Sequence, residues 1–209
     1  MKAVLSACLL FGLLSPVALL QCYFCPGGLC DTPEIVNCTD DQDACVSAIN
    51  KFRIGEIYPG SNIHSKYCGK TREDCVNKRF SMHVGEDASY RSHLECCCRD
   101  NCNKEFLTLS DPVKLPPNGI QCPSCIAFGE TECSETENIA CTGEETKCIV
   151  GAMVVETDTE QQPSDIAFQG CGTPSICTAK ISKAPVSSNE MKYTVKRIQC
   201  INNTEVITV

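Results

Sequence analysis

The spacing of the cysteines, which is repeated along the chain, constrains the fold more than any other feature of the sequence. Measured from Cys22 in the first half and from Cys122 in the second, the offsets are 0, 3, 8, 16, 23, 46, 53, 74 and 0, 3, 11, 19, 26, 49, 55, 78. The two series agree to within four residues at all eight positions, which chance does not produce. The sequence therefore predicts a domain that has been duplicated.

The start of the chain predicts secretion. Lys2 precedes an apolar run over residues 3–20, which two serines, a glycine and a proline interrupt. Such a run is too short and too broken to span a bilayer well, and it has the form of a cleaved signal peptide. We expect cleavage after Ala18, so that residues 1–18 leave together with Cys8 and 19 of the 20 cysteines remain. We therefore expect a secreted, extracellular protein whose cysteines are oxidised.

A chain with this composition has little material for a large apolar core. It contains 20 cysteines, no tryptophan, and only seven phenylalanines and five tyrosines among 209 residues. Small domains of this kind are held by disulfides. In the loop-entropy model a bridge that closes about 24 residues contributes ~3 kcal/mol. Several bridges together exceed the net stability of a typical domain, so we expect the reduced chain not to fold.

The net charge of −8 restricts the class of partner. Residues 21–110 carry 10 Lys/Arg against 13 Asp/Glu, and residues 111–209 carry 7 against 13. Nucleic acids and anionic membrane surfaces attract basic proteins, so both are disfavoured as partners. A basic protein partner fits this charge.

The repeat divides the mature chain into two domains. We expect the first domain over residues 19–103, a linker over residues 104–120 and the second domain over residues 121–209. Prolines restrict the backbone of the linker and make it semi-rigid. Four long intervals show no sustained helical period, and each is expected to form a hairpin: Cys45–Cys68, Cys75–Cys96, Cys148–Cys171 and Cys177–Cys200. We therefore predict an all-β, disulfide-rich fold with short strands in which loops dominate.

The residues at the two ends of the first copy resemble a known family. Leu20-Gln21-Cys22-Tyr23-Phe24-Cys25-Pro26 at the start, and Cys96-Cys97, Asp100 and Cys102-Asn103 at the end, are similar to the lymphocyte-antigen-6/urokinase-receptor family. This resemblance covers both copies. It implies two tandem three-finger (snake-toxin-like) domains, in each of which β-loops project from a disulfide knot, and it implies that Asn103 ties the knot to the first loop.

The resemblance also implies a disulfide connectivity, which the spacing alone leaves open. The implied pairs are Cys22–Cys45, Cys25–Cys30, Cys38–Cys68, Cys75–Cys96, Cys97–Cys102, Cys122–Cys148, Cys125–Cys133, Cys141–Cys171 and Cys177–Cys200. The second copy departs from the family because Ile201-Asn202-Asn203-Thr204 stands where the last small disulfide loop is expected. The first copy has an extra cysteine, Cys98.

An odd number of cysteines leaves one of them over. We expect this one to be Cys98, because that choice preserves the spacing from Cys97 to Cys102. The alternative is that Cys98 replaces Cys97 or Cys96 in the framework. An exposed thiol in an oxidising compartment becomes capped by a small thiol or links two chains into a homo-oligomer.

Three motifs of the second copy resemble the gamma-type phospholipase A₂ inhibitors, which are two-domain secreted members of the family. The motifs are Leu115-Pro116-Pro117-Asn118-Gly119, Gly143-Glu144-Glu145-Thr146-Lys147-Cys148 and Asp165-Ile166-Ala167-Phe168-Gln169-Gly170-Cys171. The resemblance implies a secreted, non-enzymatic protein whose partner is a secreted phospholipase A₂. Amphibian courtship pheromones of the sodefrin-precursor type are similar two-domain relatives, so an extracellular signal or receptor modulator is the alternative.

Enzymatic and metal-binding interpretations have less support. Cys96-Cys97-Cys98 with His93 and Cys102 resembles a zinc cluster, but cysteines of a secreted chain form disulfides before they hold a metal. His93 is followed by Leu94, where a phospholipase would need its catalytic Asp. No glycine-flanked nucleophilic serine is present. We therefore expect no enzymatic activity, no cofactor and no metal, with His64 and His83 as solvated strand residues.

The charges of two neighbouring fingers in the second copy differ in sign. The interval Cys148–Cys171 has four acids and no Lys or Arg: Glu156, Asp158, Glu160 and Asp165. The interval Cys177–Cys200 has five bases against Glu190: Lys180, Lys183, Lys192, Lys196 and Arg197. Such segregation produces a directional field that steers a charged partner, so the four acids are candidate partner-binding residues.

Two further features concern modification and membrane attachment. Asn37-Cys38-Thr39 and Asn202-Asn203-Thr204 are glycosylation sequons. The use of Asn37 is doubtful because the middle residue is a framework cysteine. A glycolipid anchor requires a hydrophobic tail, and the nine residues after Cys200 are too few and too polar, so we expect no membrane anchor.

Overall fold

A computed structural model describes most of the chain after residue 18. The described residues are 19–25, 28, 30–55, 60, 62–75, 79–85, 88–109, 115–157, 163–178, 186–187 and 191–201. The predicted signal peptide, residues 1–18, lies outside the described residues, as do the sequon at Asn202 and the acids Asp158 and Glu160.

The described chain consists almost entirely of β-strands, as predicted. The strands of the first domain are β1 (Gln21–Phe24), β2 (Glu34–Asn37), β3 (Ala44–Ile54), β4 (Asn62–Gly69), β5 (Arg79–Val84) and β6 (Ala88–Cys97). Those of the second domain are β7 (Pro117–Phe128), β8 (Glu137–Thr142), β9 (Lys147–Thr157), β10 (Ser164–Gly172), β11 (Val186–Ser187) and β12 (Met191–Ile201). Two single helical turns, α2 (Thr71–Asp74) and η1 (Pro174–Cys177), follow β4 and β10.

The strands pair in antiparallel hairpins, which form three fingers in each domain. The four hairpins expected from the long intervals are β3–β4, β5–β6, β9–β10 and β11–β12. The first fingers are β1–β2 and β7–β8. The tandem three-finger fold is therefore confirmed.

The expectation of short strands is wrong. β3, β9 and β12 each have 11 residues and β7 has 12. The distal parts of β3 and β9 carry Phe52, Ile54, Met153 and Val155, which are buried against the other domain. Because burial continues to the finger ends, the ladder hydrogen bonds there are shielded from water and the strands extend.

The linker is shorter than expected at its C-terminal side. β7 begins at Pro117, inside the range 104–120 that was predicted to be linker. Pro117 pairs with Thr142, and the register then shifts before Gln121. The side chain of Asn118 donates to the carbonyl oxygens of Gly143 and Glu145 at 3.0 and 3.1 Å. These side-chain bonds hold a proline-containing edge strand that lacks a complete ladder of its own.

Disulfides form the base of each domain. The nine pairs are Cys22–Cys45, Cys25–Cys30, Cys38–Cys68, Cys75–Cys96, Cys97–Cys102, Cys122–Cys148, Cys125–Cys133, Cys141–Cys171 and Cys177–Cys200. These are the pairs that the family resemblance implies. Cys98 is the free cysteine of the described chain and is exposed.

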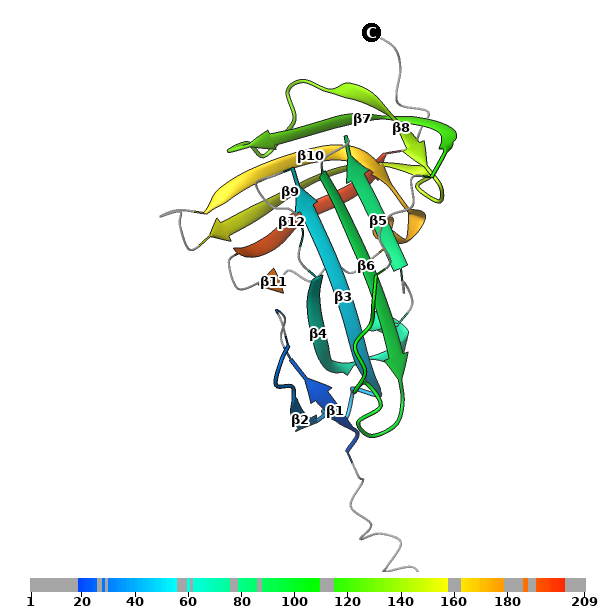
Figure 1. Ribbon diagram of the computed structural model, residues 1–209, viewed down its shortest axis with the longest axis vertical. Helices are drawn as coiled ribbons and strands as arrows, with labels where there is room; N and C mark the ends of the chain where they lie inside the picture. Colours follow the sequence, from blue (N-terminus) through cyan, green and yellow to red (C-terminus); the bar gives the residue numbers. More distant parts are fainter. Residues whose placement is uncertain are drawn as a thin grey trace, which may run out of the picture.

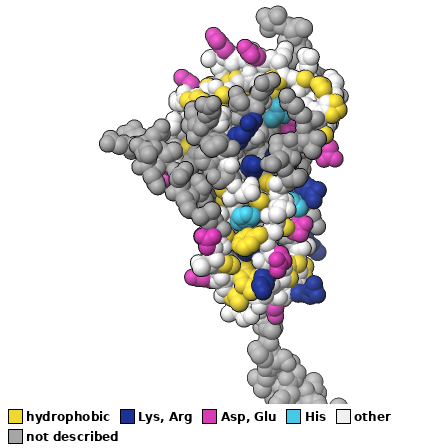
Figure 2. All heavy atoms as spheres, in the orientation of Figure 1, with side chains coloured by type: hydrophobic (Ala, Val, Ile, Leu, Met, Phe, Trp, Pro, Cys, Tyr) yellow, Lys and Arg dark blue, Asp and Glu magenta, His cyan; other side chains and the backbone are white. Residues whose placement is uncertain are grey.

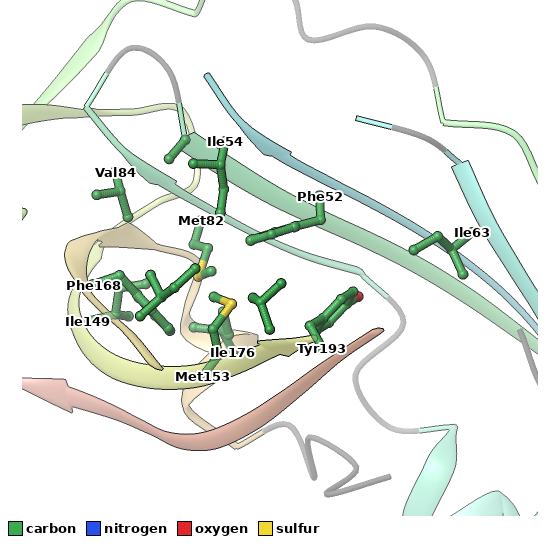
Figure 3. Close-up of a cluster of buried hydrophobic side chains, with 13 residues drawn as sticks. Phe52, Ile54, Ile63, Met82, Val84, Ile149, Met153, Phe168, Ile176 and Tyr193 are labelled. Carbon is green, nitrogen blue, oxygen red and sulfur yellow. The ribbon is translucent and has the colours of Figure 1, made fainter. Parts of the chain in front are cut away.

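The two domains share one hydrophobic core and one sheet. In the large sheet the order is β11-β12-β9-β10-β5-β6-β3-β4, so β10 of the second domain is paired with β5 of the first. Figure 1 shows the strands of the second domain running across the ends of the first-domain strands. Thirteen buried side chains from both domains pack together there, including Phe52 and Met82 from the first domain and Phe168 and Tyr193 from the second (Figure 3). The domains are therefore packed against each other and are not separate units on a linker.

Candidate binding surface

The junction between the domains fixes how the fingers of one domain lie relative to those of the other. Backbone pairing joins His83 to Cys171 and Met82 to Gly172. A Cβ atom on Gly170 would lie 2.2 Å from the carbonyl oxygen of His83, which is closer than atoms can approach. Glycine is therefore required at position 170 for the two backbones to meet.

A buried carboxylate completes the junction. Glu145, between β8 and β9, is only 7% exposed, and His83 Nδ1 lies 2.5 Å from its Oε2. Ser81 Oγ donates to Glu145 Oε1 at 3.1 Å. On the other side of the contact, the N–H of Thr173 donates to the carbonyl of Ser81 at 3.0 Å. Hydrogen bonds to a charged group are stronger than neutral ones and directional, so these contacts set the orientation of the domains.

Aromatic side chains from both domains pack beside this cluster. The rings of Phe52 and Tyr193 have centroids 5.3 Å apart, and Phe80 and Tyr90 are 5.6 Å apart. Burial raises the pKa of Tyr90 to about 12. Its hydroxyl group therefore stays protonated and donates to Asn50 Oδ1 at 2.8 Å. His83, which was expected to be a solvated strand residue, instead contacts Glu145 across the junction, and that expectation is wrong.

Asn103 holds the first finger of the first domain to the rest of the knot. Its Oδ1 accepts from the N–H of Tyr23 at 2.9 Å, and its Nδ2 donates to the carbonyls of Tyr23 and Val46 at 2.9 and 3.0 Å. Asn103 is 3% exposed. This is the role that the family resemblance implies for Asn103.

A buried lysine, which the sequence reasoning missed, supports the same finger. Lys66 is 1% exposed, and its Nζ donates to the backbone carbonyls of Asn103, Lys104 and Glu105 at 2.5, 2.8 and 2.8 Å. The same Nζ lies 4.4 Å from the centre of the Phe106 ring. One signal was present in the sequence: Lys66 stands two residues before framework Cys68, so alternation places both side chains on one face of the strand.

The first finger of the first domain is exposed. Within the finger, Ile35 is 54% exposed and Phe24 37%. Phe106, in the segment that follows Asn103, is 48% exposed. Tyr23 and Ile35 are directly opposed on β1 and β2, which puts their side chains on one face of the hairpin. This finger therefore presents large apolar side chains to solvent.

The acidic finger of the second domain is different from the prediction. Glu156 pairs with Lys192 at 3.0 Å, and Asp165 pairs with Lys196 at 2.8 Å. β12 lies beside β9, and β9 beside β10, so Lys192 of β12 neutralises Glu156 on β9 and Lys196 reaches Asp165 on β10. Acids and bases that are separated along the sequence therefore lie next to each other in the structure at Glu156 and Asp165. Asp158, Glu160, Lys180 and Lys183 lie outside the described residues.

The other predicted residues lie on strands or in bridges. His93 is within β6 and contacts Glu95 at 3.4 Å. His64 is within β4 and packs edge-on against Phe106, with ring centres 5.1 Å apart. Two groups of three close cysteines occur in the described chain, and all six are disulfide-bonded, so they offer no thiolate to a metal. Asn37 is exposed, and its Oδ1 accepts from Gln21.

Comparison with known proteins identifies relatives along the whole chain. The family model described as the u-PAR/Ly-6 domain matches twice, at residues 18–105 and 118–204. The chain is 27% identical to a gamma-type phospholipase A2 inhibitor of Gloydius brevicaudus siniticus, over 94% of this chain and 95% of the relative. It is 28% identical to phospholipase A2 inhibitor NAI of Notechis ater, over 85% and 86%, and 26% identical to protein RoBo-1 of Rattus norvegicus, over 75% and 61%. Among the described residues, no helix has the length and apolarity needed to cross a membrane.

Proposed function

This chain belongs to the u-PAR/Ly-6 domain family, and on that premise we propose that it is a secreted, non-enzymatic binding protein that inhibits a secreted phospholipase A₂. The observation that carries the proposal is the alignment of both domains, in order and almost end to end, with phospholipase A2 inhibitors. A single shared domain would support only a binding scaffold. Agreement over both domains supports a shared two-domain architecture.

The packing of the two domains favours binding over catalysis. The buried polar contacts of Glu145, His83 and Ser81 join two domains and leave these side chains committed to each other. A rigid scaffold with exposed fingers loses little conformational entropy when it binds a protein. Such a scaffold is well suited to blocking the surface of an enzyme.

The test is direct inhibition. Purified, disulfide-intact protein is added to a panel of secreted phospholipases A₂, and hydrolysis of phospholipid vesicles is followed together with binding to the immobilised enzymes. We expect inhibition of at least one enzyme at near-stoichiometric protein. Reduced and alkylated protein is the control and should be inactive. Absence of both binding and inhibition across the panel would overturn the proposal.

A second function rests on the diversity of the relatives. Protein RoBo-1 and a Ly6/PLAUR domain-containing protein of Bos taurus are each 26% identical to the chain, close to the value for the inhibitors. The relatives of this chain are therefore not all named as phospholipase inhibitors, and we propose as the second candidate an extracellular signal or receptor modulator, such as a pheromone. Expression in liver or plasma is expected for an inhibitor, whereas expression in a skin or courtship gland is expected for a signal.

A further inference from the structure

The β1–β2 hairpin ends in an unpaired strand edge. Among the described residues, β2 pairs with β1 alone, and these two strands form a separate sheet. β2 has four residues, and Ile35 at its centre is 54% exposed. An unpaired edge with an exposed apolar side chain is a surface that proteins normally cover or protect with charge.

The exposed ring of Phe106 lies on the same side of the hairpin as Ile35. Cys25 and Lys66 are directly paired, since each N–H donates to the carbonyl of the other at 2.8 and 2.9 Å. Alternation places Tyr23 on the same face as Cys25, and His64 on the same face as Lys66. Because the Phe106 ring contacts both His64 and Lys66, it lies on the face that carries Tyr23 and Ile35. We name Tyr23, Ile35 and Phe106 the first-finger patch.

The loop that carries the first-finger patch is acidic. The loop from Cys22 to Cys45 contains five acids and no Lys or Arg. Asp41 is paired with Lys70, but Asp31 and Glu34 are exposed and form no ion pair with any residue that the structure describes. Glu105 and Lys104, beside Phe106, are both exposed. Figure 2 shows acidic, basic and hydrophobic side chains beside one another over the lower part of the molecule.

The first-finger patch is held firmly from behind. The N–H of Gln21 donates to Asp100 Oδ1 at 2.9 Å, the N–H of Asn101 donates to the carbonyl of Gln21 at 2.7 Å, and Asn103 bonds both backbone groups of Tyr23. A preorganised hairpin pays little ordering entropy when a partner docks. Exposed apolar area, an acidic loop and a rigid support therefore occur together in one hairpin.

From this combination we propose that the first-finger patch docks a basic, partly apolar surface of a protein ligand. The proposal deepens the proposed function and rests on it for the identity of the ligand, a basic secreted phospholipase A₂. The apolar side chains provide the buried centre of the contact. Asp31 precedes β2, and Glu34 lies at its open edge with the side chain on the Phe24 face of the hairpin; both pair with Lys or Arg of a ligand that reaches around this edge. In the second finger of the second domain, Glu156 and Asp165 are already paired and contribute less.

The test compares matched charge reversals on the two first fingers. The probes are a basic and an acidic secreted phospholipase A₂, and binding and inhibition are measured separately. Asp31→Lys with Glu34→Lys reverses the charge of the acidic loop in the first domain. Glu135→Lys with Glu137→Lys is the matched control, because Glu137 begins β8 as Glu34 begins β2. Ile35→Ser and Phe128→Ser form a second matched pair, as Phe128 is 50% exposed on the second domain.

We expect the Asp31/Glu34 reversal to weaken binding of the basic enzyme at least about tenfold and Ile35→Ser to weaken it about fivefold or more. Both control variants should bind like the wild type, and the acidic enzyme should bind weakly throughout. Intact mass and circular dichroism establish that each variant has its nine disulfides and native fold.

The outcomes separate the two proposals. Wild-type inhibition that every variant retains would overturn the docking site and leave the proposed function intact. Binding of the basic enzyme without inhibition, lost in the first-domain variants, would support the docking site and overturn the inhibitor function. Dimers that form in the wild type and are abolished by Ile35→Ser would show that a second copy occupies the patch. That result, or no binding of the basic enzyme, would overturn the docking proposal.

Discussion

The first fingers of the two domains have corresponding cysteines but are attached to their domains in different ways. In the second domain β7 joins the large sheet, pairing with β10 from Cys125–Gln169 to Phe128–Ile166. In the described part of the first domain, the corresponding contacts are the bridge between Cys25 and Lys66 and a hydrogen bond from the N–H of His64 to the carbonyl of Gly28 at 3.1 Å. In place of the longer ladder, the first domain uses side chains, chiefly those of Asn103 and Lys66.

The residues that follow the second cysteine explain this difference. Cys25 is followed by Pro26-Gly27-Gly28, whereas Cys125 is followed by Ile126-Ala127-Phe128. Proline has no N–H for a ladder and glycine weakens a strand, while β-branched and aromatic residues favour one. The comparison teaches that the cysteine framework places a finger, but neighbouring residues decide how long a strand ladder attaches it to its domain.

The largest expected effect comes from removing the amide that replaces the ladder. Asn103→Ala should lower the free energy of unfolding by about 4 kcal/mol, because three buried backbone groups lose their partner at about 1–3 kcal/mol each. The measurement is denaturation with the disulfides intact, with hydrogen exchange of β1. The control Asn118→Ala removes three bonds from a half-buried position in the second domain and should cost about 1–2 kcal/mol, because water can replace the partners there. Equal costs would contradict the comparison.

Lys66 and Gln169 occupy matched positions, two residues before Cys68 and Cys171. Lys66→Met should destabilise the protein by about 3 kcal/mol, since three carbonyls lose a charged donor. Gln169→Met should cost less than about 1 kcal/mol, because the backbone hydrogen bonds between β7 and β10 attach the finger there. Chemical denaturation of the pair decides the matter. A larger effect at Gln169 would show that the ladder is the weaker attachment.

The junction can be loosened without altering either knot. Gly170→Ala should cost about 2 kcal/mol, because the added Cβ overlaps the His83 carbonyl and forces β5 from β10. Exchange of the β5 and β10 amides should accelerate in this variant. In Gly129→Ala the new Cβ meets nothing within 4 Å, and the strain arises only from a φ of +79°. That control should lose about 1 kcal/mol without faster exchange at the junction.

The paired acids of the second domain should matter little. Glu156 is 44% exposed and Asp165 34%, so solvent screens both ion pairs. Glu156→Gln and Asp165→Asn should each change stability by less than about 1 kcal/mol and leave affinity for a basic phospholipase A₂ unchanged. Glu34→Gln measured in parallel should weaken that affinity. A stronger loss in the second-domain variants would restore their finger as the contact surface.

The smallest effect concerns pH. Burial and the nearby Lys66 lower the pKa of His64 below its ordinary value of 6.5. The unfolded chain therefore binds more protons than the folded one between the folded pKa and 6.5, and stability falls as pH drops through that window. The denaturation midpoint should decrease from pH 7.5 to pH 5. In His64→Gln the midpoint should decrease less over the same pH range. His93→Gln is measured beside it as a reference, because burial and Arg79 lower the pKa of His93 as well.

Much of the molecule could be predicted from the sequence because covalent spacing carries it. The offsets from Cys22 and Cys122 predicted the duplication, and the family resemblance gave the three-finger fold and the role of Asn103. A buried lysine such as Lys66 could not be foreseen with the same ease. Its three acceptors are backbone carbonyls, 37 to 39 residues away in the chain. Every residue has a backbone carbonyl, so the sequence does not indicate which of them accept a hydrogen bond.

By itself, the sequence determined where the knots are and which intervals form hairpins, because bridges and turns act over short distances along the chain. Only the tertiary structure decided that the two domains share a sheet and a core. Contacts such as Gly170 with His83, and Glu145 with His83, join residues that no local pattern connects. The structure likewise decided which acids are paired, since strand order places β12 beside β9. The electrostatic field of the protein depends on where the charged side chains lie in space, and their order along the chain does not give these positions.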